Sequence, residues 1–472
     1  MDTIQFSSQQ RKLLYSWLLF AITAAGIAGT LAFLVAMTRT PGVRLLPSAR
    51  SFQVMLIAHV TFALTIWLLT FISSVWAYVA GQSGVMMNRV ASWIGFAVSI
   101  LGTIIISIPL FTFQGDAVTT DYVPLLDTPL FFVGFVTFLL GIGITAATYL
   151  VGAIQKRSLT LAAYGMACAA FATLVAIVAL GVAALRLGIG ADGRVPAEYY
   201  QALFWGMGHS LQYVSVATMV VAWYAVIEVF LGVPRTNQTF AKFLFTLFAV
   251  FPLVSPLPYF LYDPILVPTQ KMWGIALDTG LSLPVILLGP LLLLWVWRTR
   301  DGALGAWLKR MPWNEPRVIS FAFSAALFAF GLSIHPATRQ GTLRTPAHYH
   351  SVVVGGVTLA FMGLAYQMIS KVNRKTAWQK AMKVQPYLFA FGLMGLVFGL
   401  LGAGDLGAPR KTYDAFVTGV AWLAPMVLMG AGAFIAAIGG ALFVGIVAWS
   451  LLRKDASRVV EVQPSLVGSP GD

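Results

Sequence analysis

The chain has 472 residues, of which 59% are hydrophobic and 10% are charged, and its formal net charge is +14. Such an apolar composition excludes a soluble globular protein and indicates an integral membrane protein. The positive charge does not indicate a nucleic-acid-binding protein, because the basic residues gather in alternate loops and not on one soluble face. Cys168 is the only cysteine. This excludes an internal disulfide, a CxxC-H haem attachment, a cysteine-ligated iron–sulfur cluster and a copper site built on paired thiolates.

Apolar runs of about 20 residues recur along the chain, and each is long enough to cross a hydrocarbon core of about 30 Å. We expect an all-α integral membrane protein with about twelve transmembrane helices in a single domain, residues 14–452, between the tails 1–13 and 453–472. In chain order, the expected spans are 14–38, 51–80, 88–112, 129–152, 160–186, 199–231, 238–256, 269–297, 317–335, 347–370, 386–404 and 414–452.

The charged residues predict the orientation of these spans. One side collects the basic clusters Arg11-Lys12, Lys156-Arg157, Arg298 to Arg310, Lys371 to Lys383 and Arg453-Lys454. The other side collects the acidic residues Asp116, Asp121, Asp127, Asp192, Glu198, Asp405 and Asp414. Positive residues favour the inner side, so we expect both termini in the cytoplasm and the protein in the inner membrane of a prokaryote. The first span follows a polar stretch and lacks a clear cleavage site, so we interpret it as retained.

All five histidines lie close to the predicted outer surface: His59, His209, His335, His348 and His350. His59 is about nine residues into the second span and His209 about ten residues into the sixth, which places each roughly 12–15 Å below its helix start. Both spans enter from outside. They therefore bring their imidazoles into one layer with the tenth span, which carries His348 and His350.

His348 and His350 are separated by two positions, and helical residues i and i+2 point to nearly opposite sides. The pair cannot grip one metal ion, but it can hold two cofactors, one on each side of a helix. An imidazole inside a bilayer is costly and usually functional. The alternative for any single helix-end histidine is an interfacial hydrogen-bonding residue.

Histidines that project inward from different helices are what a membrane haem needs, because the porphyrin supplies four nitrogens and the protein only the axial ones. Two imidazoles saturate the iron and give an electron carrier. One imidazole leaves a face open for a small ligand. The opposed pair can therefore contribute one half of a bis-histidine haem and the sole protein ligand of an open haem.

Several segments together resemble subunit I of the haem-copper oxidase and nitric oxide reductase superfamily. They are Thr345-Pro346-Ala347-His348-Tyr349-His350 followed by Val353-Val354-Gly355-Gly356, His59, Leu203-Phe204-Trp205-Gly206-Met207-Gly208-His209-Ser210-Leu211-Gln212-Tyr213, and Gly407-Ala408-Pro409-Arg410-Lys411-Thr412-Tyr413. The resemblance implies two haems. His348 would hold the high-spin haem, His59 and His350 the low-spin haem, and Arg410 with Lys411 would neutralise haem propionates.

The same resemblance assigns His209 to a second metal and Tyr213 to its side. Four residues separate the two, so they share a helix face about 5–6 Å apart at Cβ. A phenol there can supply a proton and an electron for splitting an O–O bond, although an interfacial aromatic anchor would leave the same pattern. Nitric oxide reductases of the superfamily commonly place a carboxylate there, so Tyr213 favours oxygen chemistry.

The chain departs from the superfamily after the seventh span, where Pro258 and Tyr259 stand in place of two adjacent histidines. A copper site with three imidazoles cannot be built from the remaining residues. The second metal is then either absent or held by His209 with an oxygen ligand such as Tyr259, Tyr262 or Asp263, which would favour iron over copper. For His335 we favour a surface position near the propionates over a metal ligand.

Proton delivery needs polar side chains inside the bundle. The candidates are Glu228 in the sixth span and Asp278, Thr279 and Ser282 in the eighth. A carboxylate that reaches the interface would explain Glu228 equally, and a helix–helix hydrogen-bond cluster would explain Asp278.

The sequence therefore predicts an enzyme that resembles cytochrome c oxidase. Electrons from an outer-face donor subunit or cytochrome c would pass through the low-spin haem to the open haem and reduce O2 to water with cytoplasmic protons. One alternative is nitric oxide reduction to N2O with a non-standard second metal. Another is a non-catalytic haem protein that transfers electrons or binds a gas. A transporter is disfavoured, because no matched pair of broken helices is evident.

Overall fold

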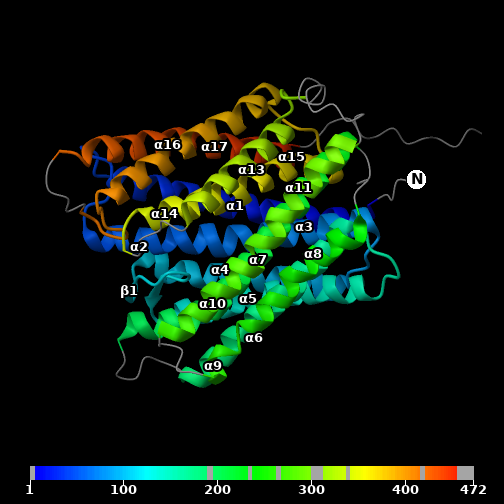
Figure 1. Ribbon diagram of the computed structural model, residues 1–472, viewed down its shortest axis with the longest axis horizontal. Coiled ribbons are helices and arrows are strands. Elements are labelled where there is room, and N and C mark those ends of the chain that lie inside the picture. Colours follow the sequence, from blue (N-terminus) through cyan, green and yellow to red (C-terminus); the bar gives the residue numbers. More distant parts are fainter. Residues whose placement is uncertain are drawn as a thin grey trace, which may run out of the picture.

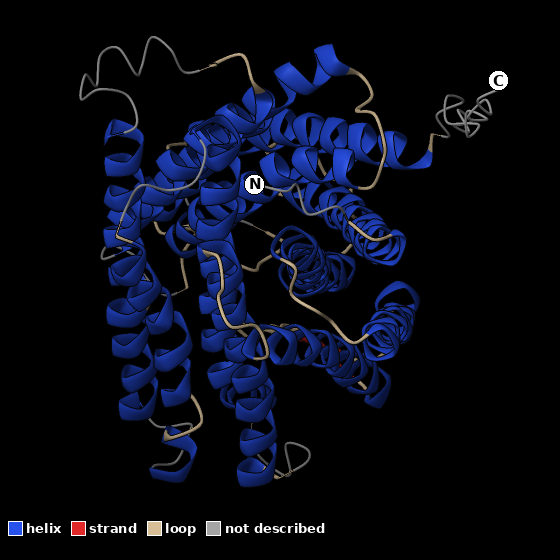
Figure 2. Ribbon diagram, turned by 90° about the vertical axis from the view of Figure 1, so that its right-hand side faces the viewer, coloured by secondary structure: helices blue, strands red, loops and turns tan. Residues whose placement is uncertain are grey.

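The computed structural model describes residues 6–188, 195–231, 237–261, 267–298, 312–335, 341–414 and 420–453. In these ranges the chain is helical apart from loops and one antiparallel hairpin of β1 (Asp116–Val118) and β2 (Leu125–Asp127) (Figure 2). Twelve of the described helices are long and apolar enough to cross a membrane. The prediction of an all-α bundle of about twelve spans is confirmed.

The first six spans lead from the N-terminal end of the chain to the helix that carries His209. They are α1 (Ser8–Thr38), the continuous helix α2 (Ala49–Val60), η1 (Thr61–Trp67) and α3 (Leu68–Ser83), then α4 (Arg89–Thr112), α5 (Pro129–Ile154), α6 (Leu161–Leu187) and α7 (Pro196–Leu231).

The remaining six spans include two that are assembled from shorter pieces. They are α8 (Gln238–Val250) with η2 (Phe251–Val254) and α9 (Pro258–Leu261), α10 (Val267–Gly280) with α11 (Ser282–Arg298), α13 (Pro316–Ile334), the continuous helix α14 (Arg344–Tyr349), η4 (His350–Thr358) and α15 (Leu359–Lys371), then α16 (Gln379–Asp405) and α17 (Leu423–Leu452).

The two largest differences from the expected span limits are at the starts of the last two spans. The eleventh span begins at Gln379 and not at 386, and the twelfth begins at Leu423 and not at 414. Apolar run length measures how much helix lies in hydrocarbon, whereas a helix can extend into the polar interface on its backbone hydrogen bonds. The first turns of α16, with Gln379 and Lys380, are such an extension.

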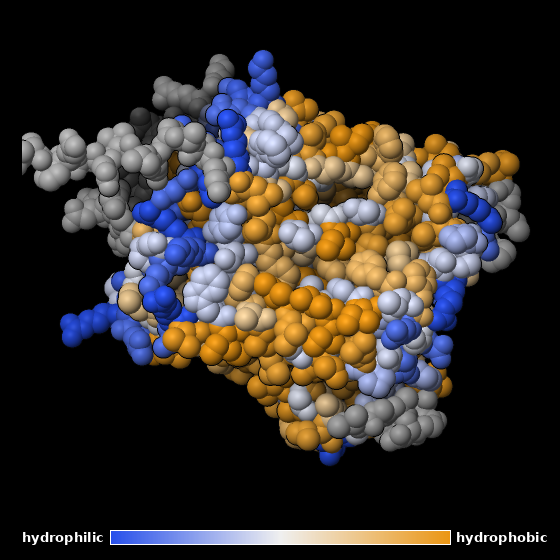
Figure 3. All heavy atoms as spheres, turned by 180° about the vertical axis from the view of Figure 1, so that it is seen from behind, coloured by the Kyte–Doolittle hydropathy of each residue, from blue (hydrophilic) through white to orange (hydrophobic). Residues whose placement is uncertain are grey.

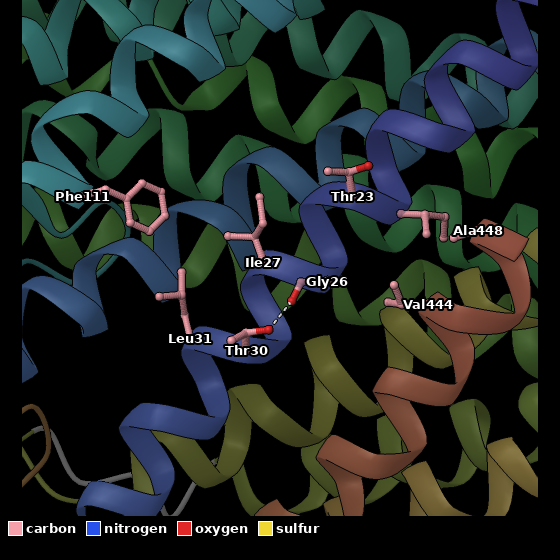
Figure 4. Close-up of a pocket in the computed structure, with 9 residues that line it drawn as sticks. Thr23, Gly26, Ile27, Thr30, Leu31, Phe111, Val444 and Ala448 are labelled. Carbon is pink, nitrogen blue, oxygen red and sulfur yellow. Dashed lines mark hydrogen bonds between the residues drawn. The ribbon is translucent and has the colours of Figure 1, made fainter. Parts of the chain in front are cut away.

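The surface carries a broad apolar band between two hydrophilic ends (Figure 3). Large hydrophobic side chains of α4 and α5 belong to it, including Leu101 (52% exposed) and Val133 (53% exposed). An apolar band of this kind suits contact with lipid tails. One groove in the apolar surface is lined by Ile22, Thr23, Gly26, Ile27, Thr30 and Leu31 of α1, Phe111 of α4, and Val444 and Ala448 of α17 (Figure 4).

We call the end of the bundle opposite the N-terminus the outer end, after the orientation expected from the charges, and it collects the histidines and the basic loop. In Figure 1 the starts of α2 and α14 and the hairpin strand β1 lie at one end of the molecule, opposite the N-terminus. The second, sixth and tenth spans all begin at this end, so their first turns form one layer.

Close helix packing depends on glycine. A Cβ added at Gly432 of α17 would overlap the backbone of Gly395 and Leu396 in α16, and one added at Gly392 would overlap Ala436. Small residues allow such backbone contact between membrane helices, where lipid removes most of the hydrophobic driving force. Gly440, on the same helix, has only the Phe389 ring near its added Cβ, at 3.7 Å.

Gly432→Ala is therefore expected to destabilise the bundle by about 1–3 kcal/mol, the usual cost of overpacking. Gly440→Ala should leave stability unchanged, since its new methyl group makes an ordinary contact. Thermal unfolding in detergent measures both variants. Equal midpoints for the two would contradict the close approach of α16 and α17.

Candidate functional site

Two π-helical segments mark the layer that holds the histidines. His59 lies just before η1, and His350 is the first residue of η4. Trp67 Nε1 at the end of η1 donates to Thr358 Oγ1 at the end of η4, at 3.4 Å. His59 precedes Trp67 by eight residues, and His350 precedes Thr358 by eight. Both helices run inward from the outer end. The two imidazoles therefore start at the same depth. π-segments of this kind are frequent at functional sites.

Three imidazoles are fixed by the same kind of hydrogen bond. The Nδ1 atoms of His59, His348 and His350 lie 3.1, 2.9 and 2.7 Å from the carbonyl oxygens of Ala28, Gly331 and Pro346. A carbonyl oxygen only accepts, so each Nδ1 carries the proton and donates it. Each Nε2 is then the unprotonated nitrogen, which is the form that ligates a metal.

The neighbouring histidines of the tenth span face different helices. His350 interacts electrostatically with His59 on the second span. His348 instead bonds to Gly331 of α13, and its ring centroid lies 4.7 Å from that of His335, at the end of the same helix. This divergence agrees with the i, i+2 spacing. His350 therefore lies on the side toward His59, and His348 on the side toward His335.

His209 of α7 lies near the depth of His348. Met219 Sδ of α7 is 3.3 Å from where a Cβ on Gly356 of η4 would stand. His209 precedes Met219 by ten residues, and His348 precedes Gly356 by eight. Since both helices run inward, both imidazoles lie roughly 12–15 Å outward of this contact.

The His209 ring is buried and hydrogen-bonded at both nitrogens. Nδ1 lies 2.8 Å from the Trp205 carbonyl oxygen, and Nε2 lies 3.3 Å from the Tyr122 hydroxyl. Gln212 Nε2 donates to that hydroxyl at 2.8 Å. Burial, followed by the neighbouring Asp121 carboxylate, raises the pKa of the Tyr122 phenol, so the hydroxyl keeps its proton.

The hydroxyl groups of the two tyrosines expected beside His209 form hydrogen bonds to backbone groups. Tyr213 is buried, and its hydroxyl donates to the Ala276 carbonyl of α10 at 2.6 Å. The Tyr259 hydroxyl donates to the Ala202 carbonyl at 2.8 Å and accepts from the Gly206 amide at 3.0 Å. Tyr259 thus touches α7 within one turn of His209 through the α7 backbone. Asp263 and Tyr262 lie outside the described residues.

The basic loop meets an acidic partner from the hairpin region. Arg410 and Lys411 both pair with Asp121, the latter at 3.2 Å, and Gln201 Nε2 donates to the same carboxylate at 2.9 Å. Burial would raise the pKa of Asp121, but Lys411, Arg410 and Gln201 together lower it. Burial also lowers the pKa of Lys411, partly offset by Asp121. One carboxylate for two cations leaves this cluster a net positive charge.

Two further arginines at the outer end were not singled out from the sequence. Arg39 donates to the Pro409 carbonyl at 3.0 Å, and Arg344 pairs with Asp405 at 2.7 Å. The Nε atoms of both are buried without a hydrogen-bond partner in the described part of the chain. Basic residues on the outer side violate the positive-inside pattern, and that signal could have identified them together with Arg410.

Two of the four residues expected on a proton path lie at the surface of the bundle. Glu228 and Thr279 are exposed, and the Thr279 hydroxyl donates to its own helix at Ile275. Ser282 opens α11, while the side chain of Asp278 lies outside the described residues.

A different polar group is buried near the inner ends of α3 and α15. The Tyr78 hydroxyl accepts from Gln367 Nε2 at 2.7 Å and from Gln82 Nε2 at 3.0 Å. Gln367 Oε1 is buried and accepts no hydrogen bond from the described residues. Long apolar runs hid these residues from the sequence analysis, because single polar residues barely change the hydropathy of a span.

The residues present fit axial haem ligation but not a metal site of several imidazoles. Three imidazoles have their Nδ1 fixed on carbonyl oxygens and present Nε2 as the ligating nitrogen, one from the second span and two from the tenth. In contrast, the described residues contain no group of three or more His, Cys, Asp or Glu side chains that could hold a metal ion. His209 would have to act there without a second imidazole.

Comparisons with known proteins identify the family and the fold of this chain. The family model described as Cytochrome C and Quinol oxidase polypeptide I matches residues 12–435. An uncharacterized protein of Rickettsia prowazekii is 25% identical over 93% of this chain and 95% of its own. Cytochrome c oxidase subunit 1 of Thermus thermophilus is 23% identical over 79% of this chain and 71% of its own. A solved heme-copper terminal oxidase dimer aligns with a TM-score of 0.78 at 19% identity, covering 95% of this chain and 85% of that one.

Asp121→Asn should destabilise the outer loops by about 1–3 kcal/mol, because two largely buried cations lose their carboxylate. The wild-type Asp121 pKa is depressed by folding, so its contribution is full above the unfolded value of about 3.9 and is lost as the pH falls through the lower folded value. Thermal midpoints measured from pH 7 to pH 3 should therefore fall less steeply in the variant.

Asp414→Asn is the matched control for this prediction. Its pair with Arg44 has side chains that are 70% and 40% exposed, so solvent screens the interaction and its loss should change little. If both variants behave alike, Asp121 does not organise the basic cluster.

Proposed function

This chain belongs to the cytochrome c and quinol oxidase polypeptide I family, and we propose that it is the haem-binding subunit of a membrane oxidoreductase that reduces O2. The observation that carries the proposal is the set of three carbonyl-anchored imidazoles in the outer layer of a haem-copper oxidase subunit I-like bundle. Each anchor fixes the ring orientation and the tautomer, which are the two conditions for strong axial ligation.

We assign the low-spin haem to His59 and His350 and the high-spin haem to His348. Two imidazoles at equal depth can saturate one iron, whereas His348 has no facing imidazole on the second span and would leave one side open. When bound, haem supplies the electron transfer and the ligand-binding iron. The net positive cluster of Arg410, Lys411, Arg39 and Arg344 at the outer end supports propionate binding, since carboxylates would take up the excess charge.

Electrons are proposed to enter from the outer face, because the histidine layer lies at that end of the bundle. Cys168 alone cannot build a copper or iron–sulfur entry centre. The donor is therefore another subunit or a cytochrome c. Protons are proposed to come from the cytoplasm, with Asp278, Thr279, Ser282 and Glu228 as candidate groups. The buried Tyr78–Gln367 pair adds a second possible entry.

Nitric oxide reduction is the second candidate function. The observation that favours it is the absence of the adjacent histidine pair at Pro258 and Tyr259, since copper needs more imidazoles than the site provides. Turnover with O2 and with NO separates the two candidates. We expect O2 consumption with a reduced donor and no N2O. Binding of either gas without turnover would instead support a non-catalytic haem protein.

The haem assignment predicts the spectra of single variants. Purified protein should contain two haems, and one of them should bind CO. His348→Ala should remove the CO-reactive haem and keep the low-spin spectrum. His59→Ala should remove the low-spin spectrum and keep the CO-reactive His348 haem, and any haem that stays on His350 alone should also bind CO. Haem quantification with reduced-minus-oxidised and CO-difference spectra measures this.

His335→Ala is the matched control, because it removes the imidazole whose ring centroid lies 4.7 Å from that of His348 but removes no assigned ligand. Both haems should survive this change, with at most a small shift in the CO-reactive band. A colourless wild-type protein would refute the proposed function outright.

A further inference from the structure

We propose that Tyr122, His209 and Gln212 form a metal-free hydrogen-bonding pocket in place of the second metal centre, beside the open face of the His348 haem. The inference rests on the proposed function, because it assumes that His348 holds an open haem. It adds a residue outside the segments that carry the family resemblance. It also sets the ligand class of the pocket, which is one small diatomic molecule that can accept a hydrogen bond.

The donor count argues against a metal. His209 is the only histidine on α7, and His59, His348 and His350 point their Nδ1 atoms to carbonyls in the haem layer. Tyr259 uses its hydroxyl on the α7 backbone, where it both donates and accepts. The fifth histidine, His335, has its ring centroid 4.7 Å from that of His348. Among the described side chains, a transition metal at His209 would therefore have a single imidazole, which is fewer ligands than stable protein sites have.

The direction of the hydrogen bonds shows how the pocket is completed. The Trp205 carbonyl accepts from His209 Nδ1, so the proton is on Nδ1 and Nε2 is an acceptor. The Tyr122 hydroxyl therefore donates to Nε2, at 3.3 Å. Gln212 Nε2 in turn donates to the Tyr122 oxygen, at 2.8 Å. The one nitrogen of His209 that could ligate a metal is already satisfied by a phenol.

The position of Tyr122 is built into the fold. A Cβ at Gly208 would overlap the Tyr122 ring, so the glycine before His209 lets the ring lie directly on α7. The ring also packs edge-on against Trp205, with centroids 5.3 Å apart. Its neighbour Asp121 is held by Gln201 and Lys411. Contacts on three sides fix the phenol next to His209.

A phenol paired with an imidazole can donate a hydrogen bond to a ligand without a metal ion. The Tyr122 O–H can turn from Nε2 to a polar diatomic ligand, and Gln212 keeps its oxygen bonded meanwhile. Such a donor stabilises a ligand that becomes negative on binding, as dioxygen does. The Tyr122 hydroxyl can stabilise one bound ligand, and no second metal is there to hold another. This favours dioxygen over nitric oxide, since N2O formation needs two nitric oxide molecules together.

The test measures metals and a ligand vibration in the purified, haem-loaded protein. Elemental analysis should find no copper, and iron only in the amount of the haem, in the wild type and in His209→Ala alike. The C–O stretch of the CO-bound haem should shift in Tyr122→Phe and in His209→Ala, because both remove part of the hydrogen-bonding pocket.

Tyr200→Phe is the matched control. It also removes a hydroxyl from the contact between α7 and the hairpin region, where Tyr200 donates to Asp127 at 2.6 Å, but it leaves His209 untouched. Its C–O stretch should match that of the wild type. A stretch that shifts equally in this variant would mean that loop loosening causes the effect, and the pocket assignment would fall.

One copper or one non-haem iron per chain that disappears in His209→Ala would overturn the proposal. So would an unshifted C–O stretch in both pocket variants. Absence of haem, in contrast, would refute the proposed function and would be recognised before any pocket variant is compared.

Discussion

The arrangement of the outer layer depends on one constraint, which is that an imidazole buried among apolar helices must satisfy both of its nitrogens. In each of the three proposed haem ligands a backbone carbonyl oxygen accepts a hydrogen bond from the Nδ1–H group. Ala28 and Gly331 belong to neighbouring helices, so the anchors also tie α1 and α13 to the ligand-bearing spans. In the proposed assignment, ligation at Nε2 would satisfy the second nitrogen of each ring, and the cost of burying the ring would be offset only when both bonds form.

The two π-helices serve the same constraint. Both follow or include a proposed ligand of the low-spin haem, and they meet at Trp67 and Thr358. A π-turn changes the angular position of the residues that precede it relative to those that follow. His59 and His350 can therefore face each other while the inner halves of both spans keep their own packing. In a regular α-helix, the orientation of the histidine would fix the orientation of the inner half of the span, so the two could not be set separately.

The loop from 119 to 124 links the basic loop to the surroundings of His209. Asp121 neutralises part of the basic cluster, and the adjacent Tyr122 closes the space beside His209. A change in the charge of Arg410 or Lys411 would therefore affect the Tyr122 phenol, because Asp121 and Tyr122 are adjacent in the chain. In this chain the surroundings of His209 and of the basic loop are organised by a loop between the third and fourth spans as well as by the helices.

The sequence determined the number of spans, their order and the histidines worth attention, because apolar run length and helical spacing are local properties that a linear chain displays directly. It also identified the departure at Pro258 and Tyr259. It did not identify Tyr122, Arg39 or Arg344, and it placed Glu228 and Thr279 in a buried path although both are exposed. The partners that define the site lie far apart in the chain, 87 residues between Tyr122 and His209 and 289 between Asp121 and Arg410. Only the tertiary packing of helices and loops decides such pairs, since neither periodicity nor hydropathy encodes which loop reaches which helix face.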